Sequence, residues 1–171
     1  MRSMTALPFQ PARSAPSIDG ILSHLESTVH ERLRHDVRRL HAAMNASPAM
    51  PNEVKSLAGL VGSSLVAHVD FEQRKIFPYA RGLERAREGL APFPPSRSGG
   101  IEALVNASRT GWGHARELLA QLSAHPEARG AIVEIARSIE ETIERAERIE
   151  EDLLFSAVRG LAPKSVPPTR V

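Results

Sequence analysis

The chain has 171 residues, enough for one domain with a substantial core, and its 22 basic and 20 acidic residues leave a net charge of only +2. This balance gives no electrostatic basis for binding nucleic acid or an anionic membrane. Cysteine is absent, which excludes disulfides, thiolate metal sites, iron–sulfur ligation and cysteine nucleophiles. Any metal site must therefore use nitrogen and oxygen ligands.

The composition favours an all-α protein. Ala, Leu, Arg and Glu are abundant, whereas aromatic area comes only from Trp112, Tyr79 and five phenylalanines. No segment approaches the roughly 18 consecutive apolar residues of a transmembrane helix, and the N-terminus lacks the apolar run of a signal peptide. We expect a cytoplasmic protein.

Two long amphipathic helices are predicted in the first half of the chain. Residues 1–16 contain prolines without a sustained period and are expected to be a flexible tail. The first helix begins after Ser17 as its N-cap, and its apolar residues recur at steps of three and four as far as Met44. The second helix begins at Pro51, and its stripe runs to Ile76 through His68 and Glu72.

Two further helices follow a connection rich in proline and glycine, residues 92–100. Their apolar stripes extend over residues 101–122 and 132–157, and residues 163–171 form a second flexible tail. We expect residues 17–162 to fold as one antiparallel up-down four-helix bundle, because the helices are long and most connections are short. Bundles of this kind build metal sites from inward-facing side chains.

Buried polar residues on the stripes predict a metal site. His68 and Glu72 are one helical turn apart on the same face, which is a metal-ligand spacing. Glu150 interrupts the apolar stripe of the fourth helix, and burying such a carboxylate needs a compensating cation or hydrogen bonds. His30 and His114 lie on or beside the stripes of the first and third helices. The predicted ligands suit iron, manganese or zinc and are His30, His68, Glu72, His114 and Glu150.

Four stretches of the chain resemble the hemerythrin-like (HHE cation-binding) superfamily, most closely its iron–sulfur cluster repair (RIC) branch. They are Ile18-Asp-Gly-Ile-Leu with Val29-His30-Glu-Arg, His68-x-x-x-Glu72 with Phe77-Pro78, His114-Ala-Arg-Glu-Leu-Leu, and Glu150-Glu-Asp-Leu-Leu-Phe155. The resemblance implies a hemerythrin-like bundle with a non-heme di-iron centre. In it Glu72 and Glu150 bridge two irons, and the histidines at 30, 68 and 114 complete the ligand set.

The chain departs from the family pattern at two points. Ala146 stands where the last family motif has a histidine, and Glu26 or Glu147 could replace that ligand. The small cysteine-containing N-terminal domain of the repair proteins is also missing, which argues against thiol chemistry.

These observations leave three functional hypotheses open, and they do not decide whether the protein is an enzyme. The first is a metalloprotein whose iron reacts with or senses nitric oxide, dioxygen or peroxide, in stress response or iron–sulfur cluster maintenance. The second is a degenerate bundle that acts as a regulatory or interaction protein without a working metal site. The third is a mononuclear site on His68, Glu72, His114 and Glu150, supported by His30.

Trp112 is expected either to fill the core or to line a ligand channel.

Overall fold

The computed structural model describes residues 16–94 and 100–161, and within these ranges every regular element is a helix. The helices join end to end into four rods. The first rod is α1 (Ile18–His24), η1 (Leu25–His30) and α2 (Glu31–Asn45), and the second is α3 (Asn52–Phe71), η2 (Glu72–Ile76) and α4 (Phe77–Arg87). The third is α5 (Gly100–Ala124), and the fourth is α6 (Ala131–Ile149), η3 (Glu150–Phe155) and α7 (Ser156–Leu161). The all-α prediction is confirmed for this part of the chain.

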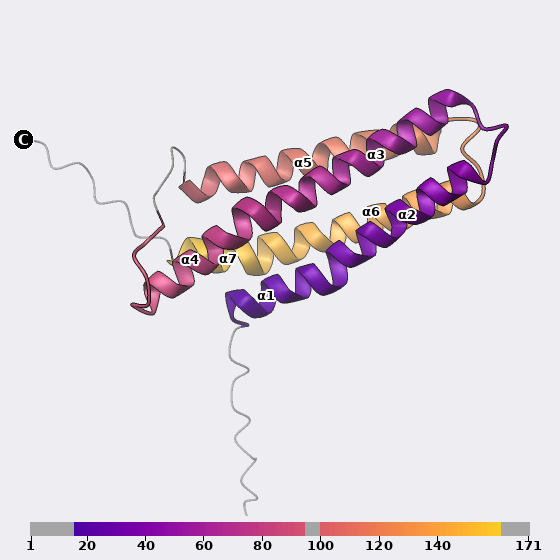
Figure 1. Cartoon of the computed structure of the whole chain (residues 1–171). Helices are drawn as coiled ribbons and strands as arrows, with labels where there is room; N and C mark the ends of the chain where they lie inside the picture. Colours follow the sequence, from indigo (N-terminus) through magenta and orange to yellow (C-terminus); the bar gives the residue numbers. More distant parts are fainter. Residues whose placement is uncertain (1–15, 95–99, 162–171) are drawn as a thin grey trace, which may run out of the picture.

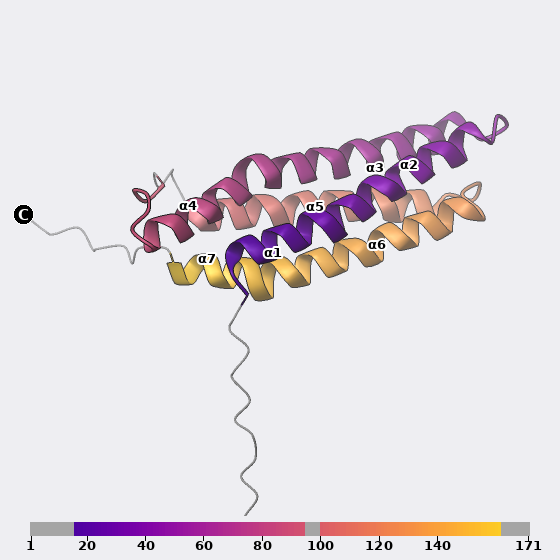
Figure 2. The same ribbon diagram turned by 60° about the horizontal axis from the view of Figure 1, so that its bottom comes forward.

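The four rods lie side by side in both views (Figures 1 and 2). The first rod packs on the second and fourth, and the third rod packs on the same two. The second and fourth rods also meet, through α4 and α7. This arrangement is compatible with a helical bundle. In Figure 1 the first rod leads from α1 at one end of the molecule to α2 at the other end. The second rod leads back from α3 to α4.

The ends of the rods follow local sequence signals. Ser17 caps the first rod as predicted, because its hydroxyl accepts a hydrogen bond of 3.1 Å from the backbone N–H of Gly20. Pro51 lies immediately before α3, where its fixed φ suits the start of a helix. Gly130 precedes α6 with a φ of 56°, a conformation that glycine adopts without steric cost.

A continuous apolar core fills the space between the rods. Its largest fully buried side chains include Trp112, Phe77 and Phe155, which lie on three different rods. The predicted tail residues 1–15 and 163–171 lie outside the described residues. No helix in the part of the chain that the structure describes is long and apolar enough to cross a membrane.

A buried carboxylate joins the first and fourth rods. Asp36 is fully buried and accepts hydrogen bonds from Arg32 Nε at 3.0 Å, Arg39 Nη1 at 2.9 Å and Ser138 Oγ at 2.8 Å. Burial alone would raise the pKa of Asp36, but these hydrogen bonds and the charge of Arg32 hold the pKa below its ordinary value. Asp36 therefore stabilises the fold as an anion.

Asp36→Asn should lower the free energy of unfolding by about 1 to 3 kcal/mol at neutral pH, because charge-assisted hydrogen bonds are lost. The contribution of Asp36 is present above its ordinary pKa of 3.8 and is lost as the pH falls below that value, so wild type and variant should converge in acid. Urea unfolding at several pH values measures the difference. Asp70→Asn, at a half-exposed ion pair, is the control and should change stability by less than about 0.5 kcal/mol. Equal effects of the two substitutions would contradict this role of Asp36.

Candidate metal centre

Three of the rods change from α-helix to π-helix where they carry a buried polar residue. His30 ends η1, Glu72 begins η2 and Glu150 begins η3, and all three side chains are buried. A π-helical turn inserts an extra residue into an α-helix, and such turns occur frequently at functional sites. The departures from regular geometry therefore coincide with the polar cluster.

The π-helical segments explain a spacing that occurs twice in the sequence. Glu72 and Phe77 are five residues apart, and so are Glu150 and Phe155. On a regular α-helix residues five apart point about 140° away from each other and do not share a face. The wider π-turn, with its i to i+5 bonding, brings them to one side, and all four side chains are buried.

Glu72 is the central residue of the cluster. Its Oε2 lies 2.9 Å from Nε2 of His30, and its Oε1 lies 2.8 Å from Nε2 of His68. Burial alone would raise the pKa of Glu72, but the hydrogen bonds and attraction from the two imidazoles outweigh burial and lower the pKa to about 2. Glu72 is therefore an anion held between two histidines of different rods.

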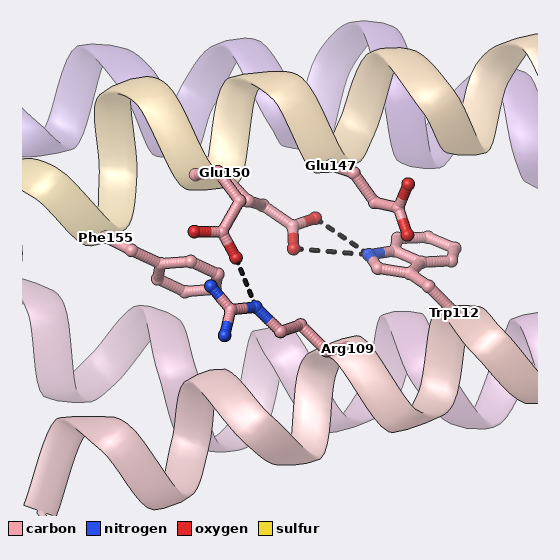
Figure 3. Close-up of a pocket in the computed structure, with 6 residues that line it drawn as sticks. Arg109, Trp112, Glu147, Glu150 and Phe155 are labelled. Atoms are coloured by element: carbon pink, nitrogen blue, oxygen red, sulfur yellow. Dashed lines mark hydrogen bonds and ion pairs between the residues drawn. The ribbon is translucent and has the colours of Figure 1, made fainter.

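Glu150 is the second buried carboxylate, and donors from α5 hold it. The indole N–H of Trp112 lies 3.2 Å from both carboxylate oxygens (Figure 3), and Ser108 Oγ lies 3.0 Å from Oε2. Ser108 Oγ also lies 3.2 Å from Oε1 of Glu72, so one hydroxyl stands between the two carboxylates. Burial, followed by the charge of Glu72, raises the pKa of Glu150 well above its ordinary value. The site thus favours a proton or a cation beside Glu150.

His68, Glu72 and Glu150 form a buried group that could hold a metal ion. Each offers one ligand atom, and these atoms lie within 4.8 Å of one another. An ion with nitrogen and oxygen ligands at about 2.0 to 2.2 Å keeps its ligand atoms up to about 4.4 Å apart, so only small shifts are needed. The residues present fit one ion, and their donor types do not select one metal.

His30 lies outside this group of three but reaches it through Glu72. Its ring stacks on Phe77, with centroids 5.5 Å apart and planes inclined by 8°. Its Nδ1 is buried without a hydrogen-bond partner among the described residues, which costs about 1 to 3 kcal/mol. Ala146 is also fully buried and supplies no ligand atom. The His30 side of Glu72 is therefore poorer in ligands than the His68 side.

The structure does not bring His114 to the buried cluster. Its side chain is exposed on α5, and the core positions on either side of it belong to Trp112 and Ala115. The apolar stripe of α5 runs through Val105, Ser108 and Trp112 because the large indole releases far more free energy on burial than an imidazole or the flanking glycines. His114 lies at the surface, where it borders a groove that His68 also lines.

Neither of the substitute ligands expected from the sequence enters the cluster. Glu26 is partly exposed, and its closest cation, Arg81, is 4.0 Å away. Glu147 is also partly exposed and pairs with Arg116 at 2.7 Å. The residues that do support Glu150 are Ser108 and Trp112. Ser108 was not among the predicted site residues. In the sequence it could have been found because it places a hydroxyl among the apolar residues of the third predicted helix.

A surface pocket reaches Glu150 from outside. It measures about 470 Å³ and is lined by Arg109, Trp112, Glu147, Glu150, Glu151 and Phe155. Figure 3 shows the indole nitrogen of Trp112 directed at both oxygens of Glu150, with the side chain of Arg109 beside them. Arg109 Nε pairs with Glu151 at 2.6 Å at the exposed side of this pocket. Trp112 therefore fills the core, which was one of its two expected roles, and it also lines this pocket. A ligand channel at Trp112 stays a prediction.

Comparison with known proteins adds no relative, since no protein-family model, no curated protein and no solved structure matches this chain. The interpretation of the cluster consequently rests on its own residues: two histidines, two carboxylates, a serine and a tryptophan, all buried between the rods.

Proposed function

We propose that the protein binds one metal ion through His68, Glu72 and Glu150. The observation that carries this proposal is the mutual approach of three buried ligand atoms to within 4.8 Å. Two carboxylates in one apolar core are costly unless a positive charge compensates them, and the raised pKa of Glu150 has this origin. A divalent cation supplies that charge, and nitrogen and oxygen ligands suit iron, manganese and zinc.

The proposal extends to the hemerythrin-like family, in which the rods form an antiparallel up-down bundle around non-heme iron. Such a metal would supply a Lewis-acidic or redox-active centre for nitric oxide, dioxygen or peroxide. In this chain the pocket at Trp112 and Phe155 offers small molecules a route to Glu150. A role in stress response or iron–sulfur cluster maintenance, in the cytoplasm, is part of the same proposal.

The protein's own residues prepare the site in three ways. Trp112 and Ser108 orient Glu150, and His30 orients Glu72 from the opposite side. Phe77 keeps water from the His30 side of the cluster, since its buried ring stacks on His30. The poor ligand supply beside His30 and Ala146 favours one tightly held ion over two.

A second candidate function is a regulatory or interaction bundle in which the polar cluster works without metal. It is supported by the hydrogen bonds of the cluster, because His30, His68, Ser108 and Trp112 provide donors for every carboxylate oxygen of Glu72 and Glu150. A proton on Glu150 would then replace the cation. The two candidates predict opposite results in a metal-binding experiment.

The protein should take up about one metal ion per chain when it is stripped with a chelator and reloaded with ferrous iron, manganese or zinc. Elemental analysis gives the stoichiometry, and absorption spectra under air and under nitric oxide test the reactivity of the iron form. His68→Ala should weaken metal binding at least about tenfold, since a ligand is lost. His114→Ala is the matched control and should bind metal as the wild type does, because its side chain is exposed.

Only trace metal with all three ions would refute the proposal and leave the metal-free bundle. Two ions per chain would restore the di-iron expectation. Equal losses in the two histidine variants would place the metal between α3 and α5 instead of at Glu150.

A further inference from the structure

Two ion pairs join α5 to the fourth rod, before and after Glu150 along the chain. Arg116 Nη2 contacts Glu147 Oε2 at 2.7 Å, and Arg109 Nε contacts Glu151 Oε1 at 2.6 Å. Both carboxylates line the pocket of about 470 Å³ that reaches Glu150, which we name the Glu150 pocket. Figure 3 shows Arg109 reaching from α5 toward the fourth rod beside Glu150. The pocket thus leads past two partly exposed carboxylates to a buried one.

The charges of the Glu150 pocket favour a cation. Its lining contains three carboxylates, Glu147, Glu150 and Glu151, but only one guanidinium, that of Arg109. A cleft lined mainly by one sign of charge concentrates ions of the opposite sign and raises their association rate, by about tenfold or more in favourable cases. Arg109 offsets part of this attraction as long as it holds Glu151.

The pair between Arg109 and Glu151 is weak enough to open. The side chain of Arg109 is 55% exposed and that of Glu151 is 34% exposed. Ion pairs with this exposure change an equilibrium constant by a factor of about five at most, because water screens both charges. When the guanidinium turns into solvent, Glu151 offers its carboxylate to the pocket. Glu151 is also the next residue in the chain after Glu150, so the two carboxylates follow one another along the same wall.

A second surface pocket lies against the ligand set on the side of His68, between α3 and α5. It measures about 480 Å³, and Leu60, Phe71 and Leu118 give it apolar walls. No Asp, Glu, Lys or Arg lines it. A hydrated cation would lose water there without meeting an opposite charge, which costs free energy. Of these two pockets, the Glu150 pocket is therefore the better path for a cation.

We propose that the Glu150 pocket is the entry route for a divalent metal ion and that the ion pair of Arg109 and Glu151 controls its use. Glu151 is the first carboxylate on this route and hands the ion to Glu150. Arg109 competes with the ion for Glu151 and so slows entry. This inference rests on the proposed metal site of His68, Glu72 and Glu150, and it concerns the rate of loading instead of the end point.

The rate of cobalt(II) uptake by the metal-free full chain tests the route, since the visible absorption of this ion changes when protein ligands replace its water. Glu151→Gln removes the first carboxylate and should slow uptake about five- to tenfold. Arg109→Gln frees Glu151 and should speed uptake by about the same factor. The dissociation constant should stay within about threefold of the wild type in both variants, because the three ligands are unchanged and the altered charges are exposed to screening by salt. Release should therefore change nearly as much as uptake.

Asp19→Asn and Arg81→Gln are the matched controls, because they make the same charge changes at an exposed ion pair of 3.0 Å between α1 and α4. Both should load cobalt at the wild-type rate. Faster uptake in Glu151→Gln as well as in Arg109→Gln would overturn the role of Glu151, since the pair would then be a mere obstruction. Full occupancy with unchanged rates in both variants, or equal changes in the controls, would overturn the route and leave the metal site standing. A wild type that takes up no cobalt would refute the metal site itself, and the route with it.

Discussion

Glu72→Ala should lower the free energy of unfolding of the metal-free protein by about 3 to 5 kcal/mol, the cost of removing one partner from a buried ionic network. Glu72 is the anion that pairs with both His30 and His68, at 2.9 and 2.8 Å. Without it two buried imidazoles lose their acceptor, and Nδ1 of His30 is already unpartnered. No other side chain in the described ranges bonds both histidines.

Chemical denaturation in the presence of a chelator measures this effect. The melting temperature should fall by roughly 10 °C or more. Glu144→Ala, at a half-exposed residue of the fourth rod, is the control and should change stability by less than about 0.5 kcal/mol.

The effect of Glu72 should also depend on pH. The pKa of Glu72 in the folded protein is about 2 and lies below the ordinary 4.5, so the contribution of Glu72 is present above pH 4.5 and fades as the pH falls toward 2. The difference between wild type and Glu72→Ala should shrink over that interval, and a difference independent of pH would refute the ionic explanation.

Glu150→Gln should have opposite effects on stability and on metal binding. Without metal, the substitution removes a buried charge and keeps the shape, and the amide oxygen still accepts from Trp112. The new NH₂ group donates to Ser108 Oγ, whose own proton is then free for Glu72. We expect a gain of about 1 to 3 kcal/mol at pH 8. Metal affinity should fall more than about tenfold, because a carboxylate ligand is replaced by an amide.

The pH dependence of this gain follows from the raised pKa of Glu150. Ionisation of Glu150 is disfavoured in the fold, so the wild type loses stability as the pH rises above the ordinary value of 4.5. The advantage of Glu150→Gln should therefore be small near pH 4.5 and grow toward pH 8. Unfolding curves with chelator and metal titrations measure the two effects. Glu151→Gln, at the neighbouring partly exposed position, is the control and should show neither. Metal affinity that survives in Glu150→Gln would remove Glu150 from the ligand set.

Much of the fold was predictable from the sequence because the apolar stripes are long and their boundaries carry strong signals. The predicted stripes fall within the four observed rods, and Ser17 and Pro51 mark helix starts as expected. The approach of His68, Glu72 and Glu150 was also predictable, since a buried carboxylate on each of two apolar stripes requires a common partner. Membership of the hemerythrin-like family stays a prediction.

The position of the third helix about its own axis was not predictable from periodicity alone. A stripe through Gly111 and His114 and a stripe through Trp112 and Ala115 fit the same period, and the structure buries the second. The π-helical segments were equally hidden, because no single residue type encodes them. The repeated Glu and Phe, five residues apart, was their trace in the sequence.

The position of Trp112 gives the protein an optical reporter of its own site. It is the only tryptophan in the chain, its indole N–H bonds Glu150, and its ring lies 3.7 Å, centroid to centroid, from that of His68. Indole emission depends on the charge and polarity of its immediate surroundings. Changes at the carboxylate or at the imidazole can therefore be followed by fluorescence in the unmodified chain, without a label and without background from other tryptophans.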